Sequence, residues 1–292
     1  MERRDNLAAP LQGKIMKILK RLRRYPTAVF GIAVVLFFLI MAIIGPFVAP
    51  YGYAAQNIPE RLQPPSAEHI FGTDQFGRDI FSRIIVGSRD VYISAGSATA
   101  FAVFFGLSLG LFSGYKGGVL DDIVMRIMDI VMSIPTLLLA MVVLFSLGSS
   151  RLNLILVVGF LYIPIVSRVV RSVVLDVKTR QFVEAAKLRG EKSSYILFRE
   201  ILPNVLPHLA VEASMRFCYA IFTVASLGFL GLGVQPPAPD WGLMVSDART
   251  WFELAPWILV APAGAIALLV VGVGFMSDGL SKLLLPGGVS NV

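Results

Sequence analysis

Cysteine and histidine are almost missing from this sequence. Of its 292 residues, one is a cysteine and two are histidines. These counts exclude an internal disulfide and argue against cysteine-rich zinc or iron–sulfur sites and histidine-based metal sites. Charged residues are also scarce: they make up 15% of the chain, against about 25% in an ordinary soluble domain. No stretch is long and polar enough to fold alone as a soluble catalytic domain.

Apolar residues are present in excess. They make up 56% of the chain, and the mean hydropathy is +0.74. A water-soluble globule of this size cannot bury so much apolar surface, and disorder requires low hydrophobicity. The composition therefore excludes a soluble enzyme and a disordered chain, and it predicts an integral membrane protein.

The chain contains six stretches without Asp, Glu, Lys or Arg. A bilayer core of about 30 Å needs about 20 apolar residues in a helix. The fourth stretch is short but extends if Arg168 snorkels toward the interface, and the fifth begins earlier, near Leu206. The sequence thus predicts an all-α membrane protein, a bundle of six transmembrane helices. The stretches are 25–59, 91–115, 130–150, 152–167, 217–239 and 254–277.

Lysine and arginine lie mostly on one side of this predicted topology. Residues 1–25 and 168–200 each hold eight basic residues. Because cytoplasmic loops retain basic residues, we expect both termini in the cytoplasm. The basic N-terminus then acts as a topology signal that contacts lipid headgroups and not as a nucleic-acid site. The apolar run after it is too long for a cleaved signal peptide.

The predicted topology divides the chain into five parts. They are a basic cytoplasmic segment (1–25), a first transmembrane helix (26–50), an extracytoplasmic segment (51–90), a five-helix core (91–286) with a cytoplasmic loop at 176–203, and a C-terminal tail (287–292).

Two enzyme signatures can be dismissed. Residues 106–110 match the G-x-S-x-G pattern of a nucleophile elbow, but they lie inside a predicted membrane helix without histidine. The chain has no phosphate-binding G-x-x-x-x-G-K-[ST] loop. We therefore expect no catalytic residue, no metal ligand and no ATP hydrolysis in this chain.

Small residues recur every fourth position along the second predicted helix. They share one face, and in lipid such a face lets another helix approach closely. We expect a packing role. The residues are Ser94, Ala98, Ala102, Gly106, Gly110 and Gly114.

Glu212 and Arg216 are the charged pair inside the fifth predicted helix. They are four residues apart, so they share a helix face and can form an ion pair. Charges inside a span are often functional. Structural pairing is favoured here over a role in a transport path.

The cytoplasmic stretch 181–204 is the most informative part of the sequence. We expect a short helix with Phe182, Ala185, Ala186 and Arg189 on one side, ended by Gly190 in a left-handed conformation. A second short helix, 193–200, is expected to stop at the following proline. The pair could lie on the membrane as an amphipathic helix, or it could dock a cytoplasmic partner.

Several motifs resemble one family of membrane proteins. Glu184-Ala185-Ala186 with Gly190 and Ile201-Leu202-Pro203 resembles the EAA loop of ABC-importer permeases. Residues 71–83, residues 226–237 with Trp241-Gly242, and residues 278–280 resemble the C-type subunit of dipeptide and oligopeptide permeases. The resemblance covers roughly residues 25–286.

This resemblance implies a type I ABC-importer permease bundle in the cytoplasmic (inner) membrane, crossing it several times. It implies four kinds of partner: a second homologous permease, two ATP-binding subunits, an extracytoplasmic substrate-binding protein and the lipid bilayer. No nucleic acid is expected. ATP and Mg would be bound by the partner subunits, and this chain would hold no cofactor. The EAA loop would dock on an ATP-binding subunit. The implied substrate is a di- or oligopeptide, although the family also carries nickel complexes, glutathione, opines and oligosaccharides.

Two positions depart from the family pattern. Glu200 stands where a histidine is usual, and Asp90 stands where an apolar residue is usual. The first alters the charge of the docking loop. The second puts a charge at the outer end of the second helix.

The segment before the second helix has two open roles. Thr73 or Asp74 can cap a short helix, and Asp79 and Arg83 are spaced to pair. Bracing of the outer helix end is favoured over contact with the binding protein. The site comprises Asp74, Arg78, Asp79 and Arg83.

Two rival functions remain at this point. One is an ion-coupled secondary transporter, which would need ionisable groups or broken helices near the membrane midplane. The other is a channel subunit that is not coupled to ATP.

Overall fold

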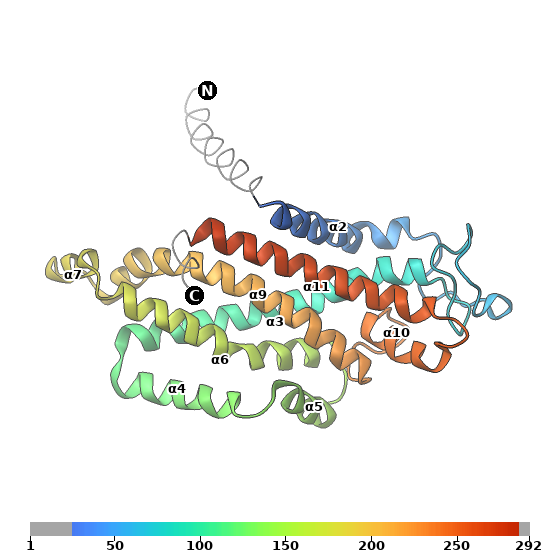
Figure 1. The fold of residues 1–292 in the computed structure, drawn as a ribbon. Coiled ribbons are helices and arrows are strands. Elements are labelled where there is room, and N and C mark those ends of the chain that lie inside the picture. The colour runs from blue at the N-terminus through green and yellow to red at the C-terminus, as the bar shows by residue number, and fades with distance from the viewer. Residues whose placement is uncertain (1–24, 286–292) are drawn as a thin grey trace.

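The computed structural model describes residues 25–285, and within them it is a helical bundle without a β-strand. The long helices run alongside one another, with α7 at one end and α10 toward the other (Figure 1). An all-α membrane protein is therefore confirmed. The helices are α2 (Pro26–Val48), α3 (Ile80–Lys116), α4 (Gly118–Met132), α5 (Thr136–Leu147), α6 (Arg151–Val177), α7 (Gln181–Leu188), α8 (Ser193–Tyr195), α9 (Leu202–Phe229), α10 (Trp241–Ala248) and α11 (Trp257–Leu284).

Five helices in the described part are long and apolar enough to cross a membrane: α2, α3, α6, the continuous helix Ser193–Phe229, and α11. The prediction of one helix over 130–150 is wrong. This region contains the last turn of α4 and all of α5, and the two helices are bent by 84° relative to each other. The bend falls at Pro135, which has no N–H and disfavours helical geometry at Ile134. The predicted number of six membrane spans holds if α4 and α5 together form one broken span.

Two predicted helices are longer than their apolar stretches. α6 continues past Arg168 to Val177, so the expected extension of the fourth stretch is confirmed, whereas the snorkelling of Arg168 stays a prediction. α3 begins at Ile80, so residues 80–90 of the predicted extracytoplasmic segment are helical. With 37 residues, α3 is about 55 Å long at 1.5 Å per residue. It is therefore longer than a bilayer core is thick. Two predicted parts lie outside the described residues: the N-terminal segment 1–25, except for Tyr25, and the tail 287–292. The side of the membrane on which the two termini lie stays a prediction.

The small-residue face of α3 packs against α6. All six small residues from Ser94 to Gly114 are buried. A Cβ atom added to Gly106 would lie 2.6 Å from the Cβ of Val166, and one added to Gly114 would lie 3.1 Å from that of Val174. The two backbones thus approach closely because no side chain separates them. The partner of this face is a helix of the same chain.

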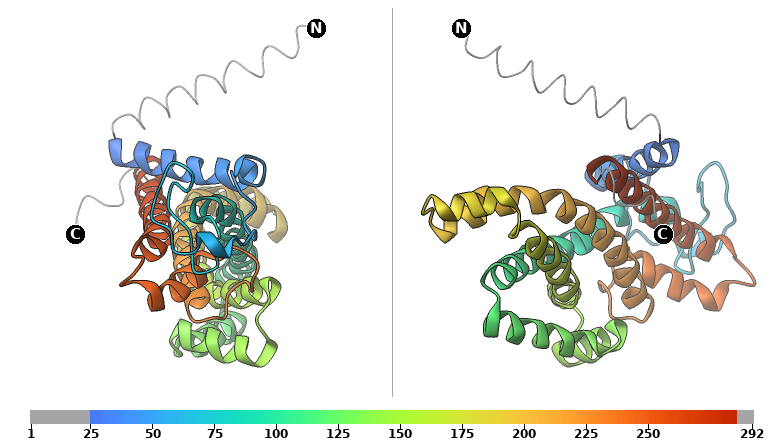
Figure 2. Two further views of the ribbon diagram at one scale, coloured as in Figure 1. Left: turned by 90° about the vertical axis from the view of Figure 1, so that its right-hand side faces the viewer. Right: turned by 60° about the vertical axis from the view of Figure 1, so that its left-hand side comes forward.

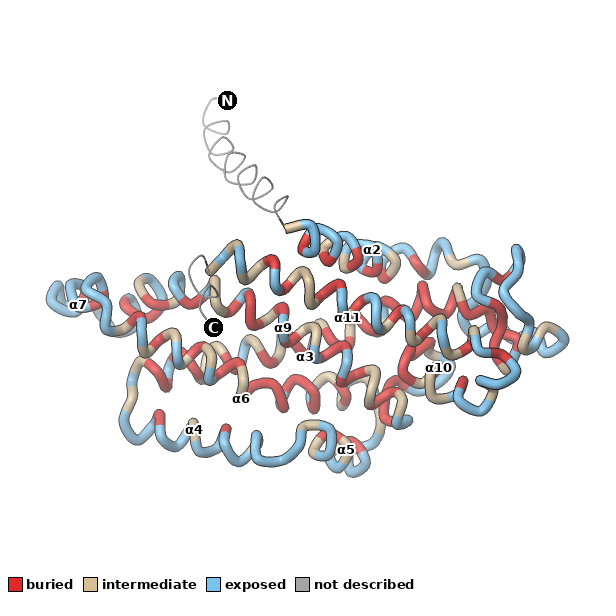
Figure 3. The backbone as a smooth tube through the Cα atoms, in the orientation of Figure 1, coloured by how far each residue is buried: buried red, intermediate tan, exposed pale blue. Residues whose placement is uncertain are grey.

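α2 and the α4–α5 pair lie on opposite sides of the bundle (Figure 2). α2 packs beside α11: a Cβ on Gly31 would lie 2.6 Å from the backbone nitrogen of Met276, and the rings of Phe30 and Phe275 are 6.3 Å apart. Buried residues concentrate on α3, α6 and α9, whereas α2 and α4 expose most of theirs (Figure 3). Many of these exposed residues are large and apolar, as expected for helices that face lipid or another membrane subunit.

We predict that Gly106→Leu destabilises the protein by about 2 kcal/mol, because the new side chain overpacks the contact with Val166. Gly274→Leu in α11 is the matched control, since a Cβ there meets nothing within 4 Å. Thermal melting in detergent checks the pair. Equal melting temperatures for the two variants would contradict the proposed packing.

Candidate functional site

The short helix α7 projects from one end of the bundle and carries the Glu-Ala-Ala motif (Figure 1). Val183 and Ala186 are fully buried, and they pack against the segment that starts at Ile196. Glu184 and Ala185 are exposed. The expectation that Phe182, Ala185 and Ala186 lie on one side of the helix is therefore wrong for Ala186, which is buried with Val183 while Phe182 and Ala185 are exposed.

The end of α7 is a left-handed turn at Gly190. Its φ is +76°, a conformation that a residue without a Cβ adopts at no steric cost. The N–H of Glu191 donates to the carbonyl of Ala186 at 3.2 Å, the bond that closes a helix in a Schellman-type ending. Gly190 thus has the conformation that its position in the sequence predicts.

The helix after this turn does not stop at Pro203. Residues Ile196–Ile201 form a π-helical segment that continues directly into α9. Pro203 has no N–H, and its ring would clash with the carbonyl of Arg199 in a regular α-helix. Widening the helix by one residue avoids this clash. The side-chain amide of Asn204 donates to the carbonyl of Glu200 at 2.7 Å and so satisfies an acceptor of the widened turn.

The loop is anchored to the bundle through the C-terminal half of α6. Arg171 binds Asp121 of α4 through two bonds of 2.6 Å, and Lys178 donates to the carbonyl of Gly114 at 2.8 Å. Arg168 forms an ion pair with Asp129 of α4. α6, which leads through residues 178–180 into α7, is thus tied to both α3 and α4.

The outward side of the loop is exposed and mixes apolar with charged side chains. Leu188 is 89% exposed, and a groove of about 570 Å³ beside Gly190 is lined by Tyr195, Phe198 and charged neighbours. Glu200 lies 3.8 Å from Arg189, so it forms a long ion pair inside the loop. A pair of this length at the surface contributes little to stability.

A second cluster of charged residues lies at the N-terminal end of α3, which the predicted topology places at the outer side of the membrane. Asp74 accepts from Arg78 Nε at 2.6 Å, and Arg83 Nε lies 4.0 Å from the same carboxylate. Asp79 caps α3 by accepting from the N–H of Ser82 at 2.7 Å. The expected pairing of Asp79 with Arg83 is therefore wrong, because Arg83 turns toward Asp74. The expected cap at Thr73 or Asp74 is also wrong, because α3 begins after Asp79.

His69 belongs to this cluster and was missed by the sequence reasoning. Its Nδ1 lies 2.8 Å from Asp79 and its Nε2 lies 3.4 Å from Glu60, while the side chain is 3% exposed. Burial lowers the pKa of His69, but the two carboxylates outweigh it, so that the pKa lies above the ordinary value of 6.5. Only the folded loop brings these three residues together, and no spacing rule could have found them.

The turn between α9 and α10 is built around Asp240, a further residue that sequence reasoning missed. Burial raises the pKa of its carboxyl to about 6, although backbone N–H groups such as that of Leu243 donate to it. A Cβ on Gly233 would lie 2.9 Å from this carboxylate. The glycines of the 226–237 motif therefore leave room for Asp240.

The ion pair inside α9 is formed as its spacing allows. Glu212 Oε1 and Arg216 Nε are 2.8 Å apart, and both residues are buried. The guanidinium also lies over the ring of Tyr219 at 4.7 Å. The pair is enclosed by its neighbours, an arrangement suited to a structural role.

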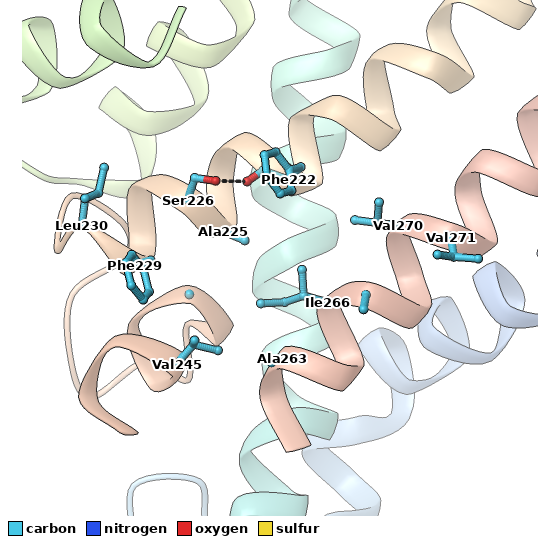
Figure 4. A pocket seen from close by; sticks show the side chains of 12 residues that line it. Phe222, Ala225, Ser226, Phe229, Leu230, Val245, Ala263, Ile266, Val270 and Val271 are labelled. Carbon is cyan, nitrogen blue, oxygen red and sulfur yellow. Dashed lines mark hydrogen bonds between the residues drawn. The ribbon is translucent and has the colours of Figure 1, made fainter. Parts of the chain in front are cut away.

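An apolar groove of about 530 Å³ lies between α9, α10 and α11 (Figure 4). Its hydroxyl, on Ser226, donates to the carbonyl of Phe222 at 2.8 Å. The groove therefore offers no free side-chain donor for a polar solute. It suits an apolar chain or the helix of a partner.

Two family profiles match the chain. Residues 106–287 match the binding-protein-dependent transport system inner membrane component, and residues 16–65 match the N-terminal transmembrane domain of oligopeptide transport permease C.

Curated relatives cover most of the chain. A dipeptide transport system permease protein of Alkalihalophilus pseudofirmus is 42% identical over 91% of this chain and 88% of its own length. A probable D,D-dipeptide transport system permease protein of Escherichia coli is 39% identical over 92% and 91%. A glutathione transport system permease protein of Escherichia coli is 39% identical over 91% and 88%.

We predict that protonated His69 stabilises the outer cluster. A histidine whose folded-state pKa is raised contributes stability that is fully present below pH 6.5 and is lost as the pH rises through the folded-state pKa. Between pH 6.5 and 9 the wild-type melting temperature should thus fall more than that of His69→Gln. Asp240, whose pKa is raised to about 6, is present in both proteins, so its titration affects the two profiles alike. Parallel pH profiles for the two proteins would refute the prediction.

Proposed function

The chain belongs to the family of binding-protein-dependent transport system inner membrane components and is a permease subunit of an ABC importer, and from this we propose that it guides di- or oligopeptides across the membrane. The named relatives support this substrate class, because they carry dipeptides, D,D-dipeptides or glutathione, and glutathione is itself a tripeptide. The bundle offers few fixed charges, which fits a weakly selective path and leaves selection to the binding protein.

Permeases of this family are not catalytic, and the ATPase activity lies in separate subunits. As an importer permease, the chain works with an ATPase and a substrate-binding protein. We place it in the cytoplasmic (inner) membrane beside a second homologous permease and above two ATP-binding subunits, which hold ATP and Mg. The ion-coupled transporter and the uncoupled channel subunit are set aside, because the chain belongs to an ATP-driven family.

The observation that carries the coupling role is the two-sided packing of α7. Val183 and Ala186 attach the helix to the π-helical segment, while Glu184, Ala185 and Leu188 face outward. A helix held on one side and free on the other can dock in a partner and still move with the bundle. The attachment leads through Ile201, Leu202 and Pro203 directly into α9.

ATP would drive transport through this loop by differential binding. ATP closes the dimer of ATP-binding subunits, and the segment Glu184–Gly190 follows that motion. A ligand shifts a conformational equilibrium only as far as its affinities for the two states differ. The displaced loop would then favour one of two arrangements of α6 and α9, open to one side of the membrane or to the other.

The charged cluster around Asp74, at the opposite end of the bundle from α7, serves to brace the N-terminal end of α3. Asp74, Arg78, Asp79 and Arg83 are each less than 8% exposed. Buried side chains with partners of their own leave little charge for a binding protein to contact, so bracing is favoured over direct docking.

We predict that Leu188→Glu abolishes co-purification of the ATP-binding subunit, because it puts a charge on the outward side of α7. Leu254→Glu is the matched control: this leucine is 72% exposed, and it lies near the opposite end of the bundle. Pull-down from native membranes in mild detergent, followed by mass spectrometry, gives the readout. Recovery of the ATP-binding subunit with both variants would refute docking through α7. A variant with Glu184→Ala and Gly190→Pro should lose the subunit as well.

We further predict that the binding protein sets the substrate. Proteoliposomes with the complete importer should take up a dipeptide with its own binding protein, and the solute transported should change when the binding protein of a related importer replaces it. Uptake of labelled solutes measures both. An unchanged substrate range after the exchange would show that the permease itself selects.

A further inference from the structure

A polar cavity of about 350 Å³ lies at the outer end of the bundle. It is bounded by Arg89 and Asp90 of α3, by Arg151 at the start of α6, and by Tyr53 and Pro239 from the loops. Arg89 is exposed, and the other two charged residues are partly buried. None of these residues takes part in the coupling loop or in the cluster around Asp74.

The cavity carries an excess of positive charge. Arg151 Nη2 lies 2.5 Å from Asp90 Oδ1, so these two charges balance. Arg89 has no ion pair within the described residues, and the Arg151 side chain is 39% exposed beside its bond to Asp90. One exposed guanidinium without a partner, next to a second one that is accessible in part, favours an anion with several oxygen atoms.

The depth of these charges in the membrane follows from the sequence. Arg89 and Asp90 come directly before the charge-free stretch 91–115 of α3, and Arg151 comes directly before the charge-free stretch 152–167 of α6. Charged residues at the end of an apolar span lie at the level of the lipid headgroups. The cavity is therefore at the height of a phospholipid phosphate.

An apolar groove of about 400 Å³ between α2 and α3 adjoins the cavity. The two share Arg89 and Ile93 as lining residues, and the rest of the groove is formed by side chains such as Leu39, Ile43 and Phe47. Ile43 is 64% exposed and Phe47 is 87% exposed. A cationic cavity thus continues into an apolar groove that is lined by residues 39–47 of α2 and 89–93 of α3.

We propose that the cavity and the groove together bind one anionic phospholipid. Its phosphate contacts Arg89 and Arg151, and one acyl chain lies in the groove between α2 and α3. A peptide fits less well, because its free amino end would meet an excess of positive charge and its polar backbone would lie in an apolar groove. The inference does not depend on which solute the importer carries.

The test uses the full-length chain purified with its partner subunits in mild detergent. Phosphatidylglycerol is titrated in, and native mass spectrometry counts the bound lipid. We expect Arg89→Gln to weaken retention about fivefold, since one basic residue near the membrane surface contributes about 1 kcal/mol toward anionic lipid. Arg89→Lys should keep most of the binding. Arg61→Gln is the matched control, because Arg61 is also an exposed arginine of the outer end but does not line the cavity.

Three further results decide the proposal. Equal retention by Arg89→Gln and Arg61→Gln would overturn it. Displacement of the lipid by glycerol phosphate at equal concentration would overturn it too, because a free headgroup does not use the groove. Displacement by a dipeptide would assign the cavity to the solute path instead. Failure of dipeptide uptake in proteoliposomes would count only against the proposed function and would leave this site standing.

Discussion

The close contact between α3 and α6 is the constraint on which the rest of the bundle depends. In lipid there is no water to expel, so helices associate through dispersion contacts, which require short distances. A row of small residues from Ser94 to Gly114 lets the backbone of α3 lie this close to α6 over about six turns. Both ends of α6 then have fixed positions. Its outer end brings Arg151 to Asp90, and its inner end holds Lys178 against the last turn of α3.

The two ends of the bundle are held together by different kinds of interaction. The outer end is built from buried charges with several partners each, as at Asp74 and Asp79, and such networks hold a backbone in one arrangement. The inner end relies on apolar packing at Val183 and on a widened helix turn before Pro203. π-Helical turns of this kind often occur at functional sites. The proposed coupling motion therefore begins at the end that has the fewer buried polar bonds and the irregular helix turn.

Much of this architecture could be predicted from where charges are absent, because a span must be apolar over its whole length. The turn at Gly190 was predictable for a local reason: a left-handed residue after a helix favours glycine. The errors have non-local causes. α4 and α5 separate because Pro135 breaks an apolar stretch that length alone would make one span. Arg83 pairs with Asp74 instead of Asp79 because the loop folds back and offers Asp79 a histidine. Spacing along a chain says nothing about such partners.

The packing of α2 against α11 has a consequence for the order of assembly. α2 is the first described helix to leave the ribosome, and α11 is the last. The buried face of α2, which includes Ala28, Val34 and Phe38, is therefore without its full set of neighbours until the whole chain has been made. In water such a delay would invite aggregation. In a bilayer, lipid tails cover the same face at little cost in free energy, so α2 can wait in the membrane until α11 has been made.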